Sequence, residues 1–189
     1  MKNKFKETEK GFALPLALLL LVVMTIMGVT LVTISSNEHN ANNDKDSNQQ
    51  VFYAAESGIS VAKSWMVGNI TKFSSTPPNN LDSQLRFCKA SFFPNLISSN
   101  NGFHSERKTL NQVISASGDE ATRLGKFSFE YFIAYTPDQN GNNSSGKKKS
   151  GTNNILYTVY SCGCDAAANS CNPQNNVIVP LEAVVTLVN

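Results

Sequence analysis

A long run of uncharged, apolar residues near the N-terminus constrains the fold of this chain more than any other feature. The run extends from Phe12 to Ile34 and contains no Asp, Glu, Lys, Arg or His. As a helix that rises about 1.5 Å per residue it would be roughly 35 Å long, and the hydrocarbon core of a bilayer is about 30 Å thick. The sequence therefore predicts one membrane-spanning helix.

The residues around this run predict its orientation. Four lysines and two glutamates precede Phe12, and they account for the whole formal net charge of +2. A basic flank stays in the cytoplasm, so we expect a single-pass inner-membrane protein with a periplasmic C-terminal domain. An ordinary secretory signal has a shorter apolar region followed by a small-residue cleavage site, and residues 35–44 contain no such site. We predict processing at Gly11 and Phe12 instead, with an uncleaved anchor as the alternative.

Two short motifs resemble those of a known family. A Lys-Gly-Phe junction that opens directly into an apolar helix resembles the class III leader of type IV pilins and pseudopilins, and residues 50–59, QVFYAAESGI, resemble the motif that follows the anchor in PilX-type minor pilins. The resemblance implies that prepilin peptidase cuts after Gly11 and methylates the new amine of Phe12. It also implies an α+β lollipop, in which a long N-terminal helix carries the membrane anchor in its first half and packs on a C-terminal antiparallel sheet of about three to four strands.

The chain departs from the pilin pattern at one position. Most major pilins have glutamate at the fifth residue after the cleavage site, where this chain has Leu16, preceded by Pro15. In pilins this carboxylate is thought to form an ion pair with the N-terminal amine of a neighbouring subunit. A subunit that lacks it is therefore expected at the start, or tip, of a filament. The alternative is that Leu16 has no special role and reflects neutral sequence drift within an apolar segment. The residues that we expect in the membrane and assembly helix are Leu14, Pro15, Leu16, Leu19, Val23 and Gly28.

The apolar pattern changes after residue 50. Residues three or four apart then form one helical face, which the resemblance places against the sheet: Val51, Ala55, Ile59, Ala62 and Met66. No glycine or proline lies between Gly28 and Gly58, so we predict a single helix from near Leu14 to Val67, ended by Gly68. The predicted organisation is a leader at 1–11, a transmembrane and assembly helix at 12–67 and a globular pilin domain at 68–189.

Three segments in the last third of the chain predict strands. They are residues 126–135, 154–162 and 177–188. In the first, every second residue is large and apolar or aromatic, so one face of the strand holds Phe127, Phe129, Tyr131, Ile133 and Tyr135. Pro180 cannot donate to a ladder, so we expect the last strand to lie at an edge or to be bulged. No helical crossover separates the strands, which favours an antiparallel meander. Elsewhere we predict a short helix within 81–93, mostly loop at 95–125 and an exposed polar loop at 136–153.

Four cysteines in an exported chain predict two disulfides. Cys162 and Cys164 are two residues apart on a predicted strand, so their side chains point the same way and rarely bridge each other. Each therefore needs its own partner, one being Cys171 and the other Cys88, and the sequence leaves both pairings open. A zinc site is the alternative, and the C-x-C spacing fits it poorly.

The remaining residues favour a structural protein over an enzyme. His39 and His104 stand alone in polar segments, where we expect them to be solvated, and no catalytic, metal-ligand or phosphate-loop pattern is present in the sequence. We predict no cofactor and no metal. The expected function is that of a minor pilin, whose partners are other pilins through the N-terminal helix, prepilin peptidase and the inner membrane. The sequence does not decide whether the protein also binds a surface ligand or DNA.

Other functions compete with this interpretation. A pseudopilin of a type II secretion system is the alternative within the same class. A membrane-anchored periplasmic binding module that does not polymerise is the alternative from another class, and an anchored enzyme comes third. The three lysines at 147–149 are more simply explained as part of a solvated loop than as a contact for DNA or lipid.

Overall fold

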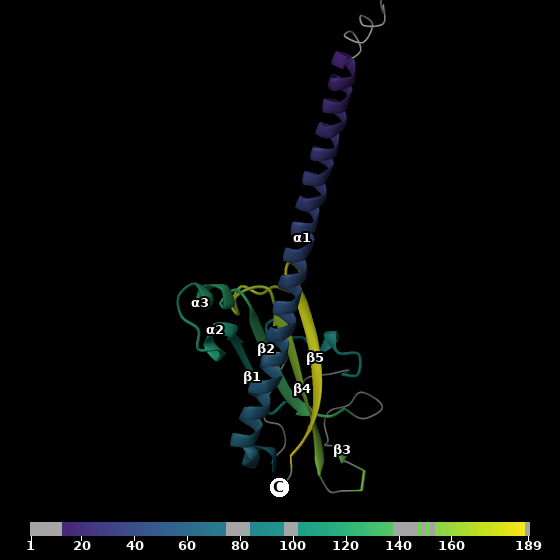
Figure 1. Cartoon of the computed structure of the whole chain (residues 1–189). Helices are drawn as coiled ribbons and strands as arrows, with labels where there is room; N and C mark the ends of the chain where they lie inside the picture. Colours follow the sequence, from purple (N-terminus) through teal and green to yellow (C-terminus); the bar gives the residue numbers. More distant parts are fainter. Residues whose placement is uncertain are drawn as a thin grey trace, which may run out of the picture. The chain divides into compact units, whose positions relative to one another are not determined.

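A computed structural model describes residues 13–74, 84–96, 102–137, 147–148, 150–151 and 154–187. The chain divides into two compact units, Met1–Asp46 and Ser47–Asn189. One helix, α1 (Ala13–Gly68), contributes its first part to the first unit and its second part to the second (Figure 1). The predicted helix from near Leu14 to Val67 is therefore confirmed. The polar stretch at 35–50 stays helical, and a 3₁₀ helix, η1 (Ile70–Ser74), follows Gly68.

The second unit contains an antiparallel sheet with the predicted meander at its centre. Strands β2 (Ser128–Tyr135), β4 (Ile155–Cys164) and β5 (Ile178–Thr186) pair in chain order. Within the described residues β5 pairs with β4 alone, so Pro180, which lies opposite Cys162, is in an edge strand as expected. Together with α1, these strands confirm the α+β class.

Two further strands complete the sheet. β1 (His104–Thr109) pairs antiparallel with the free side of β2, and β3 (Lys147–Lys148) pairs with the first residues of β4 (Figure 1). The prediction of mostly loop at 95–125 was therefore wrong, because this segment also holds the helices α2 (Leu110–Val113) and α3 (Gly118–Leu124). The sequence of β1, HSERKT, has no apolar alternation, and all six residues are half-buried. Its strand conformation depends on the ladder with β2.

The predicted helix within 81–93 was also wrong for the part that the structure describes. Residues 84–89 are not helical, and only a three-residue 3₁₀ turn, η2 (Ala90–Phe92), follows them. The backbone N–H groups of Arg86, Phe87 and Cys88 donate to the carboxylate of Glu130. Because those donors point at a strand side chain, they are not available for a helical ladder.

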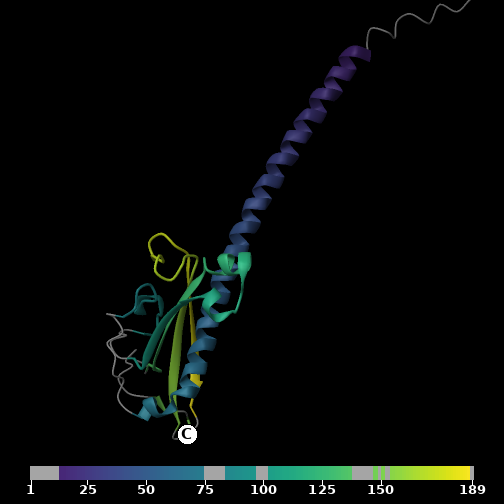
Figure 2. The ribbon, with the colours of Figure 1, turned by 90° about the vertical axis from the view of Figure 1, so that its left-hand side faces the viewer.

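The second part of α1 and the segment 84–96 cover opposite faces of the sheet (Figure 2). The face toward α1 holds Phe129, Tyr131, Ile133 and Tyr135 of β2, the alternate residues that the sequence placed together. The other face holds Phe132, Ala134, Tyr160 and the cysteines, covered by Phe87, Phe93 and Leu96. Both faces of the central strands are thus buried, which explains why all eight residues of β2 are buried.

Candidate functional site

The first candidate site is the apolar surface of α1 between Leu14 and Ile34. Every residue in this stretch is exposed. Among the described residues, one stretch of helix is long and apolar enough to cross a membrane: the part of α1 from Leu14 to His39, with a mean hydropathy of 2.7. Side chains of this size are normally buried, and a helix that is apolar on all sides requires lipid or other helices around it. The exposed fractions of its predicted contact residues are 70% for Leu14, 55% for Leu16, 67% for Leu19 and 40% for Val23.

The few polar groups in this surface are compatible with an apolar environment. Thr25, Thr30 and Thr33 each donate their hydroxyl to the carbonyl oxygen three residues earlier, at 2.8 Å. No hydroxyl of these three therefore enters lipid unpaired, which would be costly. Gly28 has open space around its Cα, since a Cβ added there would meet no group of the described residues within 4 Å. The absence of a side chain at Gly28 leaves room for another helix to approach this surface closely.

The N-terminal end of the helix carries the other predicted residues. Pro15 is the third residue of α1, where a missing N–H costs no hydrogen bond. Leu16 is exposed beside it, and no charged side chain lies between Leu14 and Ile34. The predicted processing residues Gly11 and Phe12 lie outside the described residues.

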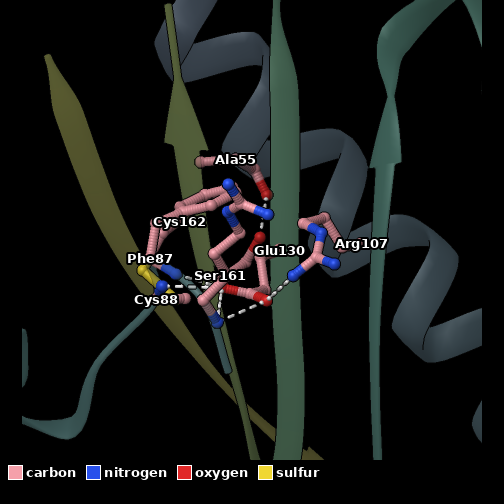
Figure 3. The surroundings of a disulfide bond; sticks show 8 residues. Ala55, Phe87, Cys88, Arg107, Glu130, Ser161 and Cys162 are labelled. Carbon is pink, nitrogen blue, oxygen red and sulfur yellow. Dashed lines mark hydrogen bonds and ion pairs between the residues drawn. A yellow bond between two sulfur atoms is a disulfide. The ribbon is translucent and has the colours of Figure 1, made fainter. Parts of the chain in front are cut away.

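The predicted helix–sheet residues are brought together on one face of α1. Val51, Ala55, Ala62 and Met66 are fully buried, and Ile59 packs partly buried against the same core. The contact is close because small residues meet there. A Cβ on Gly58 would overlap the Ser161 hydroxyl and lie 2.9 Å from the Phe129 ring, and a Cβ on Gly163 would overlap the Val51 carbonyl oxygen. Ser161 donates its hydroxyl to the Ala55 carbonyl at 2.8 Å (Figure 3).

The small residues of the FYAAESG motif face the sheet, whereas its large residues do not. Ala54, Ala55 and Gly58 are buried, but Phe52 is 41% exposed and Tyr53 is 54% exposed. On the same outward side of α1 lie further exposed residues, and we call the whole set the outward stripe: Phe52, Tyr53, Glu56, Lys63 and Val67. An exposed aromatic pair on a helix that is otherwise packed is typical of a contact surface.

All four cysteines form disulfides, as predicted. Cys88 pairs with Cys162, at a Cα–Cα distance of 5.3 Å, and Cys164 pairs with Cys171, at 6.3 Å. The structure thus decides between the two pairings that the sequence left open. Both bridges lie on the face of the sheet away from α1, because Gly163, between the two strand cysteines, faces the helix.

Glu130 has a structural role that the sequence did not predict. Its side chain is 2% exposed and accepts hydrogen bonds from the backbone N–H groups of Arg86, Phe87 and Cys88, at 2.7 to 3.0 Å. Arg107 of β1 adds an ion pair at 3.1 Å (Figure 3). The available signal was a lone carboxylate in the centre of an otherwise apolar strand, since a buried charge requires several donors.

His104 was expected to be solvated, and that prediction was wrong. Its ring stacks on the indole of Trp65, with ring centroids 4.0 Å apart and planes 4° from parallel. Burial is the main cause that lowers its pKa; Lys72 and Lys108 add to the lowering and Glu106 opposes it. Trp65 belongs to α1 and His104 to β1, so this stack fixes the end of the helix on the sheet. His39 is exposed, as expected.

The described residues offer little for chemistry on a small molecule. No group of three or more His, Cys, Asp or Glu that could hold a metal is present among them. An open hollow of about 470 Å³ lies between α3 and residues 165–170, and its lining includes Thr122, Lys126 and Asp165. Asp165 already accepts the backbone N–H of Val177 at 3.1 Å, so its carboxylate has a structural role.

The fold and these surfaces define a class of protein: an α+β domain stabilised by two disulfides, carried on a helix that is able to span a membrane. Comparison with protein-family models, with curated proteins and with solved structures finds no match.

Proposed function

We propose that this chain is a minor pilin of the PilX type, a structural subunit that takes part in the assembly of a type IV pilus. One observation carries the proposal: a helix that is apolar and exposed on all sides from Leu14 to Ile34 continues into a segment that packs on an antiparallel sheet. In the membrane the first segment would contact lipid. In a filament it would exchange those contacts for the helices of other subunits, for which small residues such as Gly28 allow close approach.

The outward stripe supports the same proposal from the second unit. Phe52 and Tyr53 form an edge-to-face pair at 6.2 Å on the side of α1 that the sheet does not cover. Aromatic side chains are favoured in the centre of protein interfaces. In this proposal the helix therefore has two surfaces for neighbouring subunits, an apolar one for the membrane-spanning part and an aromatic one beside the sheet.

The first experiment examines processing of the leader. We expect the mature chain to begin with N-methylated Phe12, which mass spectrometry of the membrane-extracted protein and of sheared filaments would detect. Gly11→Glu should abolish cleavage because it places a charged side chain at the peptidase's cleavage position. Asn3→Glu adds the same charge eight residues earlier and should leave cleavage intact. An intact Met1 end in assembled filaments would refute the proposal.

The rival functions give different results in the same preparation. A membrane-anchored binding module would be absent from sheared surface filaments and would keep its leader. A pseudopilin of a type II secretion system would be processed, and its deletion would abolish protein secretion while leaving surface pili intact. Loss of pili on deletion, with secretion unchanged, would favour the minor pilin.

The position within the filament follows from Leu16. A subunit that joins a filament can pair a carboxylate with the amine of its predecessor, but the first subunit has no predecessor, and an unpaired carboxylate in an apolar setting is costly. Leu16 therefore suits a subunit at the tip, present in few copies. Immunogold label should appear at one end of the pilus. Leu16→Glu should move label into the shaft, and Leu20→Glu, one turn away, should not. Continuous label along the shaft with the natural Leu16 would contradict the tip position.

A further inference from the structure

The two disulfides pose a problem of selection that the fold must solve. Cys162 and Cys164 are both fully buried on the face of β4 away from α1, two residues apart. Cys88 must pair with the first and Cys171 with the second. The swapped arrangement, with Cys88 bound to Cys164 and Cys171 to Cys162, uses the same four side chains on the same face of the sheet.

The entropy of loop closure hardly distinguishes the native from the swapped arrangement. The native bridges join residues 74 and 7 positions apart, and each swapped bridge would join residues two positions farther apart. Since the probability of loop closure falls roughly as the −3/2 power of loop length, the native arrangement is favoured by a factor of only about 1.5. Pairing of Cys162 with Cys164 is disfavoured once β4 has formed, because side chains two apart on a strand rarely bridge each other. Between the two remaining arrangements, an unguided chain would therefore form roughly 40% of the swapped one. Some specific contact must place Cys88 at Cys162.

The register between β2 and β4 supplies a polar residue opposite each strand cysteine. Glu130 lies opposite Cys162, and Ser128 lies opposite Cys164. Cross-strand neighbours of this kind have their Cβ atoms about 5 Å apart on the same face. The pairing of β2 with β4 thus places one carboxylate and one hydroxyl beside the two thiols, before either distant partner has to be brought in.

Each of these polar residues holds the segment that carries the correct partner. Glu130 accepts the backbone N–H of Cys88 itself at 2.8 Å, together with those of the two residues before it, and we call this group the Glu130 clamp (Figure 3). Ser128 donates its hydroxyl to the carbonyl of Ala166 at 2.6 Å, in the loop that leads from Cys164 to Cys171. Three consecutive N–H groups on one carboxylate fix the position of Cys88 along β4.

We propose that Glu130 is the residue that selects the disulfide partner of Cys88. It binds the backbone of residues 86–88 while the thiols are still reduced and places Cys88 beside Cys162. Oxidation then needs a disulfide oxidant, such as glutathione disulfide or an oxidoreductase of the extracytoplasmic compartment. One thiolate attacks the oxidant to give a mixed disulfide, the second thiolate attacks the protein sulfur, and the oxidant leaves as two thiols that carry the two electrons and two protons. This role is independent of the proposed pilus function.

The experiment follows the reoxidation of the full-length chain in detergent micelles. The protein is reduced and unfolded, returned to native buffer with glutathione disulfide, and quenched by alkylation at intervals. Peptide mapping by mass spectrometry then measures the native and the swapped pairs. We expect the natural chain to give almost only the native pairs. Glu130→Gln keeps the size of the side chain but presents an amide to the donors. It should raise the swapped isomer towards roughly 40%, the unguided fraction, which is the upper limit because Ser128 still holds the loop after Cys164.

Two further variants separate selection from general destabilisation. Glu182→Gln makes the same substitution at an exposed residue of β5, on the same face of the sheet, and should keep the native pairs. Leu110→Ala removes a buried side chain from the core on the α1 side and should weaken the fold without scrambling the bridges. The proposal is overturned if Glu130→Gln keeps the native pairs, or if Leu110→Ala scrambles them to the same extent.

Discussion

Gly163 offers the sharpest test of how α1 is fixed on the sheet. It lies between two disulfide-bonded cysteines on β4 and faces the helix, where a Cβ would overlap the Val51 carbonyl oxygen and lie 2.9 Å from the Ala55 backbone nitrogen. Both obstacles are backbone atoms, which cannot rotate away as a side chain can. Gly163→Ala must therefore move the helix away from the sheet or distort β4.

The cost can be worked from the contacts that would loosen. A gap of 0.5 to 1 Å removes about a quarter to a half of the van der Waals attraction between packed atoms, and the fully buried residues Val51, Ala54, Ala55, Ala62 and Met66 all lie in this contact. We expect a loss at the upper end of the range for overpacked cores, about 3 kcal/mol. With a urea m-value of about 1 to 3 kcal/mol per M, the midpoint should fall by about 1 to 3 M.

The assay uses a reporter that the protein already contains. The chain has one tryptophan, Trp65, on the part of α1 beside the sheet, so its fluorescence in detergent micelles follows helix docking during urea unfolding. Gly68→Ala is the matched control, because a Cβ there meets no atom of the described residues within 4 Å. If backbone entropy alone mattered, Gly163→Ala would stabilise the protein by about 0.5 to 1 kcal/mol, because glycine loses more conformational freedom than alanine when it enters a strand. An unchanged or higher midpoint for Gly163→Ala would refute the reasoning.

Three further predictions rest on single features of the structure. Thiol counting on the native, unreduced protein should find no free cysteine and should find four after denaturation and reduction; free thiols in the native state would contradict the two bridges. Burial lowers the pKa of His104 below its ordinary value of 6.5, so the unfolded chain takes up this proton first, and the free energy of unfolding should fall as the pH drops below about 6.5; His104→Gln should reduce that slope in urea titrations between about pH 7 and pH 5. Replacing Phe52 and Tyr53 by serine should lower the unfolding midpoint only slightly, because both are exposed. Under the proposed pilus function it should reduce recovery of the protein in sheared filaments, and full recovery would argue against the outward stripe as a contact surface.

The elements that depend on long, repeated patterns could be predicted from the sequence. The apolar run and the face from Val51 to Met66 predicted one continuous helix, and its C-terminal end agrees with that of α1 within one residue. The alternation in residues 126–135 identified both β2 and the side chains that face the helix. Pro180 was correctly expected to restrict its strand to an edge. In each case the pattern reflects burial against one neighbouring layer, which local sequence encodes.

The elements that depend on partners far away in the chain could not be predicted. β1 has a polar sequence, and only its ladder with β2 makes it a strand. The segment 84–89 has helical spacing of Leu85 and Cys88, but its N–H groups bind a carboxylate more than forty positions later. His104 lies in a polar segment, yet its ring meets Trp65 from α1. The sequence around each of these residues does not indicate which distant residue it contacts.

The two layers that cover the sheet differ in structure, and this difference explains why the buried carboxylate and the Cys88–Cys162 bridge lie on the face away from α1. α1 satisfies its own backbone N–H groups internally, so it can cover an apolar face with small residues alone. The segment 84–96 has almost no regular structure, so its buried N–H groups need partners in the sheet. Glu130 supplies those partners for Arg86, Phe87 and Cys88, and the Cys88–Cys162 bridge prevents the segment from separating from the sheet. A covering segment without a helix or strand of its own therefore needs acceptors from the sheet, and one carboxylate in β2 can accept several N–H groups at once, which accounts for Glu130.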